Sequence, residues 1–131
     1  MVASALVSEK IDRGGRLIKK LDASSFPVTA AFWYYFPEAE HWRLVIASPM
    51  VDAKGRQAAY GEIHRIQRRA ARLPLLSVGE ITAVSPRDPL VKLLSSAIRT
   101  GPGLSGIAFS RNVVNGVYIE DAYIYRLSKA T

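Results

Sequence analysis

The chain has 131 residues, enough for one globular domain, and no apolar stretch in it approaches the roughly 20 residues that a membrane span requires. It contains no cysteine, which excludes disulfides, thiolate metal sites and a cysteine nucleophile. Lys and Arg number 18 against 11 Asp and Glu, and the net charge of +7 favours acidic partners over basic ones.

The first expected helix covers about residues 3–22. Its apolar stripe recurs at helical spacing and contains Val7, Ile11, Gly14, Ile18 and Leu21. Gly14 and Gly15 stand in the middle of this helix, where each glycine costs about 1 kcal/mol relative to alanine. Either the helix breaks at this pair, or another backbone packs closely against it.

A β-hairpin is expected over about residues 28–48, with a polar connection at 37–41. Five consecutive aromatic residues, 32–36, project rings from both faces of its first arm. One set of rings enters the core, and the other needs cover from the chain's own helices, a second subunit or a ligand. Trp33, Tyr35 and Trp42 are therefore candidate interface residues of a homo-oligomer.

An amphipathic helix is expected over about residues 54–72. Its apolar seam recurs at spacings of three and four residues and contains Ala59, Ile63, Ile66, Ala70 and Leu73. The opposite side carries arginines, with two further cations at the edge: Arg65, Arg68, Arg69 and Arg72, with Lys54 and Arg56. Glu62 is the only acid between Lys54 and Arg72, so pairing within the helix cannot neutralise this face. The first helix could add Arg13, Arg16, Lys19 and Lys20.

The remaining elements are a short strand near 79–85, a helix at about 88–100 and a second hairpin at about 107–126. Asp88-Pro89 is a typical helix start, and Asn115-Gly116 tolerates the positive φ angles of a type I′ turn. This turn predicts a register that places Val114 opposite Val117, Arg111 opposite Glu120 and Ser110 opposite Asp121. The expected fold is a single α+β domain over 1–131, with a mostly antiparallel sheet and three helices on one of its faces.

Catalytic motifs are weak. Residues 101–106 match G-x-G-x-x-G, but they follow a predicted helix and precede a strand, which is the reverse of the dinucleotide-binding order. A small metal-dependent hydrolase would have to use Asp121 with Glu120, Glu80 or Glu62, yet none of these acids has a useful spacing to a lysine and a second acid. Asp121 is expected on one strand face with Ile119 and Tyr123, where a structural hydrogen bond explains it better than catalysis. No resident metal or cofactor is expected.

The sequence therefore favours a small, basic, non-enzymatic binding module. Its arginine-faced helix would contact a polyanionic partner, either nucleic acid or an acidic protein, because guanidinium groups suit phosphate and carboxylate oxygens. The alternatives are a homo-oligomeric assembly subunit built on the aromatic hairpin, and the hydrolase. The first residues lack the basic segment of a signal peptide, so we expect a cytoplasmic protein with no membrane partner.

Overall fold

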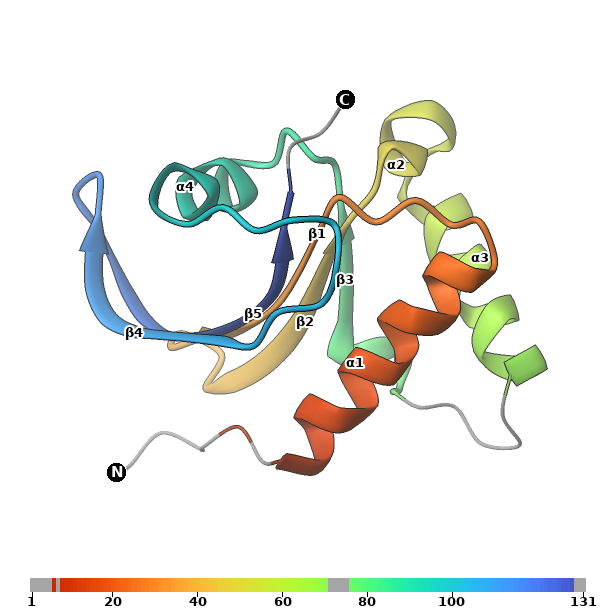
Figure 1. The fold of residues 1–131 in the computed structure, drawn as a ribbon, viewed down its shortest axis with the longest axis horizontal. Coiled ribbons are helices and arrows are strands. Elements are labelled where there is room, and N and C mark those ends of the chain that lie inside the picture. The colour runs from red at the N-terminus through yellow and green to blue at the C-terminus, as the bar shows by residue number, and fades with distance from the viewer. Residues whose placement is uncertain (1–5, 7, 71–75, 129–131) are drawn as a thin grey trace.

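The computed structural model describes residue 6, residues 8–70 and residues 76–128 (Figure 1). Its elements, in chain order, are α1 (Ser8–Ala23), β1 (Ala30–Phe36), β2 (His41–Ala47), α2 (Pro49–Lys54), α3 (Arg56–Ala70), a 3-10 turn η1 (Val78–Glu80), β3 (Ile81–Val84), α4 (Pro89–Ala97), β4 (Ile107–Val114) and β5 (Val117–Leu127). The predicted α+β class is confirmed, and all five strands belong to one sheet.

The strand order in the sheet is β3-β2-β1-β5-β4. Both predicted hairpins are present, and β1 and β5 join them by pairing antiparallel in the middle of the sheet. The short strand β3 is the exception, because it runs parallel to β2. Parallel neighbours require a long crossover connection, and α2 and α3 supply it.

Helices cover both faces of this sheet, so the prediction that they lie on one face is wrong (Figure 1). On one face, Trp33 of β1 packs in a core with side chains of α1 and α3. On the other face, Phe32 packs in a second core with Val91 and Leu94 of α4. Large apolar residues at both odd and even positions of β1 explain this arrangement, because a strand buried on both sides needs cover on both sides.

The helix α1 passes through Gly14-Gly15 without a break. Close packing is the correct alternative, but the neighbours are side chains rather than a backbone: the Tyr125 hydroxyl and the Trp33 indole lie against Gly14. The expected start at residue 3 is not supported, since Leu6 lies outside the helix and α1 begins at Ser8.

The helix predicted over about 54–72 corresponds to α3, but it begins two residues later, and a short helix that was not predicted precedes it. Ser48 caps a separate short helix, α2, by accepting a hydrogen bond from Met50 N at 3.1 Å, and Pro49 occupies its first turn. Gly55 then ends α2 with a φ of 91°, a conformation that a glycine adopts without strain. The longer helix α3 starts only at Arg56.

The late elements follow their local signals. Asp88 caps α4 by accepting from Leu90 N at 2.9 Å, although the helix ends at Ala97 rather than near residue 100. Asn115 and Gly116 have φ angles of 48° and 80°, and the strands they join keep the predicted register, including Ser110 opposite Asp121. Arg111, with a φ of 48°, is absent from the regular strand pairs and makes no ion pair with Glu120, so the expected contact between these two residues is not seen.

Candidate polyanion-binding surface

The α3 helix separates an apolar side from a cationic side, as its sequence predicts. Ala59, Ile63 and Ile66 are buried in the core that α3 shares with α1 and the sheet. Arg65, Arg68 and Arg69 are exposed. Arg72 and Leu73 lie outside the described residues. We refer to Arg65, Arg68 and Arg69, together with Lys54 and Arg56, as the α3 basic surface.

One member of this surface is held by the chain's own acid. Arg65 donates from Nε to Glu62 Oε1 at 3.2 Å and makes a second contact to the same carboxylate through its terminal nitrogen. This hydrogen-bonded contact lowers the pKa of Glu62, and Lys54 and Arg69 lower it further through their charge. The pair is solvent-exposed and therefore adds little stability, so an incoming anion can compete for Arg65 at small cost.

The other described cations of the surface form no ion pair or hydrogen bond with an acid within the described ranges, although Lys54 and Arg69 are near enough to Glu62 to act on it through their charge. Arg68 and Arg69 occupy the last turn of α3, where cations also offset the negative end of the helix dipole. Arg56 begins the helix, and a rise of about 1.5 Å per residue places its Cα about 20 Å from that of Arg69 along the helix axis. The candidate residues thus form two groups at the ends of a helix rather than one compact cluster.

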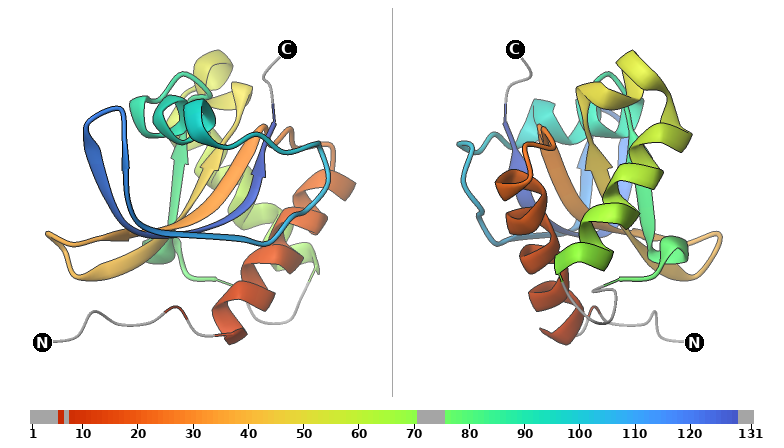
Figure 2. Two further views of the ribbon diagram at one scale, coloured as in Figure 1. Left: turned by 60° about the vertical axis from the view of Figure 1, so that its left-hand side comes forward. Right: turned by 90° about the vertical axis from the view of Figure 1, so that its right-hand side faces the viewer.

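The first helix lies beside α3 on the same face of the sheet (Figure 2). Several of its cations are paired: Arg13 with Glu9 at 3.2 Å, Arg16 with Asp12 at 3.7 Å, and Lys10 with Glu80. Lys19 is exposed and has no acidic partner in the part of the chain that the structure describes. The α1 helix therefore adds few uncompensated charges to the surface.

The aromatic residues proposed for an interface are largely covered by the chain itself. Trp33 and Tyr35 are 1% and 5% exposed, and Trp33 Nε1 donates to the Tyr125 hydroxyl at 2.9 Å. Trp42 is half-buried. Its ring lies edge-on to Tyr35 and packs against the core that the sheet forms with α1 and α3. Exposed large apolar side chains occur instead at the tip of the β4–β5 hairpin, where Val113, Val117 and Tyr118 are 62%, 45% and 54% exposed.

The candidate acids of a hydrolase do not assemble into a centre. Glu62 is held by Arg65, and Glu80 contacts Lys10 while accepting from Ser77 N at 3.0 Å. Within the described ranges, no three histidine or carboxylate side chains are close enough to hold a metal ion.

The prediction that Asp121 shares one strand face with Ile119 and Tyr123 is wrong, because Ile119 and Tyr123 themselves lie on opposite faces. Ile119 packs in the α4-side core and Tyr123 against the opposite core, because the strand pairing is irregular opposite Glu120, at Arg111. Partial burial raises the pKa of Asp121, while a hydrogen bond to the Ala122 backbone and the charge of Arg111 oppose this increase. The carboxylate is thus a half-buried group opposite Ser110 that has a backbone partner.

Comparisons with protein-family models, with curated proteins and with solved structures found no match. Among the helices in the described ranges, none combines the length and the apolar character needed to cross a membrane. The functional argument therefore rests on the surface and the pockets of this chain alone.

Proposed function

We propose that the protein is a small, non-enzymatic binding module whose α3 basic surface contacts a polyanion, either nucleic acid or an acidic protein. The observation that carries this proposal is the exposure of Arg68 and Arg69 without acidic partners on a helix whose other side is anchored in the core. The helix fixes the backbone from which both arginine side chains extend, so binding costs little ordering of the backbone.

The spacing of the surface favours an extended ligand. The Arg68–Arg69 group and the Lys54–Arg56 group lie at opposite ends of α3, about 20 Å apart along the axis. A nucleic-acid strand covers that length in about six nucleotide steps, whereas a small anion reaches one end only. Contacts of this kind are made to the backbone of the polymer and supply affinity without base specificity.

The proposal is tested by measuring binding to duplex DNA, single-stranded RNA and an acidic polypeptide by fluorescence anisotropy between about 50 and 200 mM salt. If four cations engage phosphates, the logarithm of the affinity falls with the logarithm of the salt concentration at a slope of roughly −3 to −4. The double variant Arg68→Gln, Arg69→Gln should lower the affinity and flatten the slope by about two. No binding to any of the three probes at the lowest salt, or a salt-independent affinity, refutes the proposal.

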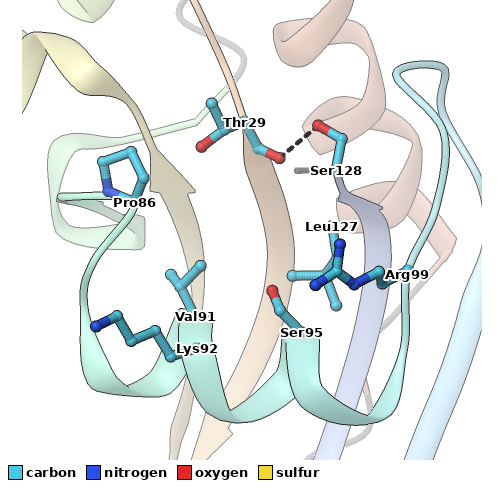
Figure 3. A pocket seen from close by; sticks show the side chains of 8 residues that line it. All are labelled: Thr29, Pro86, Val91, Lys92, Ser95, Arg99, Leu127 and Ser128. Carbon is cyan, nitrogen blue, oxygen red and sulfur yellow. Dashed lines mark hydrogen bonds between the residues drawn. The ribbon is translucent and has the colours of Figure 1, made fainter. Parts of the chain in front are cut away.

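A matched control removes the same charge from the other face of the sheet. Lys92 and Arg99 are exposed and lie on α4 and on the segment that follows it (Figure 3). The double variant Lys92→Gln, Arg99→Gln changes the net charge equally, so it should leave the affinity for the polymer nearly unchanged. An equal loss in both double variants would show attraction to the overall charge rather than contact with α3.

A second candidate is a homo-oligomeric assembly subunit, which the exposed tip of the β4–β5 hairpin favours. Val113, Val117 and Tyr118 expose apolar surface on a hairpin that ends one edge of the sheet. Association through these side chains would persist at high salt and weaken in Tyr118→Ser. Light scattering that shows a monomer at high protein concentration would refute this candidate.

A further inference from the structure

A small pocket lies between α4 and the ends of β1 and β5, on the face of the sheet opposite α3 (Figures 1 and 3). Its volume is about 150 Å³, and its apolar part is formed by Val91 and Leu127, which are buried. Lys92 and Ser95 reach it from one side of α4, and Arg99 reaches it from the segment that follows this helix. No acidic residue lines it.

The backbone around Arg99 is fixed to the sheet. Thr100 N donates to Leu127 O at 3.1 Å, and Leu127 N donates to the Thr100 hydroxyl at 2.8 Å. These two hydrogen bonds hold Thr100 beside the end of β5. They therefore fix the backbone position of the preceding residue, Arg99. The guanidinium group extends over Leu127 toward the pocket, and the Ser95 hydroxyl points toward the same space (Figure 3).

Three polar side chains of the pocket are donors that have no acceptor among the described residues. The side chains of Lys92, Ser95 and Arg99 form no hydrogen bond or ion pair with any described residue. By contrast, the Ser128 hydroxyl on the opposite wall already donates to Thr29 O at 2.9 Å (Figure 3). An incoming group must therefore accept hydrogen bonds, and the two positive charges at the rim favour an acceptor that is negatively charged.

The size of the pocket limits the rest of the ligand. A cavity of about 150 Å³ is known to hold one benzene molecule, and pockets for drug-sized ligands are several times larger. The apolar walls suit a body of that size, because burying it removes hydrocarbon surface from water. Arg99 and Ser95 stand on one side of the mouth, and Lys92 extends on the other side, where its flexible chain can turn toward a bound charge (Figure 3).

We propose that this pocket binds a small organic anion, with its carboxylate or phosphate group on Arg99 and Ser95 and a ring-sized apolar body against Val91 and Leu127. Lys92 adds a second charge at the rim. The site is separate from the α3 basic surface, because α3 and α4 lie on opposite faces of the sheet (Figure 1).

The proposal is tested by titrating the full chain with four probes and following the backbone amide signals by NMR. Phenyl phosphate and benzoate carry both the ring and the charge, inorganic phosphate carries only the charge, and benzyl alcohol carries only the ring. We expect the first two to bind and to shift the amides of Ser95, Arg99, Thr100 and Ser128. The affinity for each should fall roughly tenfold or more in Arg99→Gln, because a charge-assisted hydrogen bond is lost.

Two further variants separate the pocket from general charge effects. Ser95→Leu keeps both cations but fills the mouth, and it should abolish phenyl phosphate binding. Arg68→Gln with Arg69→Gln removes two charges from the opposite face and should leave the affinity unchanged. The NMR spectrum of each variant shows whether it is folded.

Four results would overturn the proposal. The first is the absence of binding by both organic anions at millimolar concentration. The second is equal binding of benzyl alcohol and benzoate, and the third is equal binding of inorganic phosphate and phenyl phosphate. The fourth is an affinity that Arg99→Gln does not change.

Discussion

Replacing Gly14 with alanine should destabilise the protein, even though alanine is the better helix former. A Cβ atom at Gly14 would lie 2.6 Å from the Tyr125 hydroxyl and 2.8 Å from Trp33 Nε1. Both atoms belong to a buried chain of hydrogen bonds, in which Trp33 donates to the Tyr125 hydroxyl and that hydroxyl donates to Ile11 O. The new methyl group therefore has no room unless this chain moves.

The size of the effect follows from three contributions. The gain in helix propensity is about 1 kcal/mol in favour of alanine. Overpacking a well-packed core costs about 1–3 kcal/mol, and the weakening of a buried hydrogen bond adds about 1 kcal/mol. The net loss in the free energy of unfolding should thus be about 1–3 kcal/mol for Gly14→Ala.

Gly15→Ala is the matched control, because it changes the same residue type one position further along the same helix. Its Cβ would lie 3.6 Å from Tyr125 Cε1, an ordinary contact, so the variant should be stabilised by up to about 1 kcal/mol. Urea denaturation followed by circular dichroism measures both changes. Tyr125→Phe removes the nearest obstructing atom and should lower the cost of Gly14→Ala in a double-mutant cycle. Equal stability of the two alanine variants would refute the argument.

Two more predictions concern groups that link α1 to the sheet. Asp22→Asn should cost about 1–3 kcal/mol, because Arg126 is 5% exposed and its guanidinium donates to the Asp22 carboxylate at 3.0 and 2.8 Å. Asp12→Asn, which breaks only the exposed pair with Arg16, should change the free energy of unfolding by less than about 0.5 kcal/mol; equal effects of the two substitutions would contradict the argument. Burial raises the pKa of Tyr125 from 10.0 to about 12, so its contribution to stability is complete below pH 10 and is lost as the pH rises to about 12. The free energy of unfolding, measured by urea denaturation over this range, should fall by about 2–3 kcal/mol less in Tyr125→Phe than in the parent protein, and an identical decline in both proteins would contradict the assignment.

Local signals were sufficient for much of the fold. Asp88-Pro89 marks the start of α4, and Asn115-Gly116 alone fixes the register of the second hairpin. The short helix α2 also has local signals, a serine cap and a proline in its first turn with Gly55 at its end, but it was not predicted because it has no buried residue and hence no apolar seam. The cover on both faces of the sheet follows from the aromatic run once every residue of β1 is treated as buried.

Contacts between distant segments were beyond the sequence. Arg126 has its acid partner 104 residues away, and the buried Gln67 is satisfied by both backbone groups of Leu76. The same limit applies to the sites. The separation of the arginines from the apolar side of α3 was predictable from the 3.6-residue period of a helix. The sequence did not show which arginine would pair with Glu62, because several lie within reach of it on the helix. The α4 pocket combines residues near 29, 95 and 128, so no local pattern indicates it.

The two proposed sites differ in a property that one measurement can resolve. The cations of the α3 basic surface are exposed to solvent, so the surface gains affinity only by engaging several charges at once, and that affinity should fall steeply with salt. In the α4 pocket, one anionic group meets Arg99 and Ser95, and the apolar body contributes a term that salt does not screen. Binding of phenyl phosphate should therefore weaken much less with salt than binding of a nucleic acid. Parallel salt dependences for both ligands would mean that the pocket acts only through its surface charge, and the distinction between the two sites would fail.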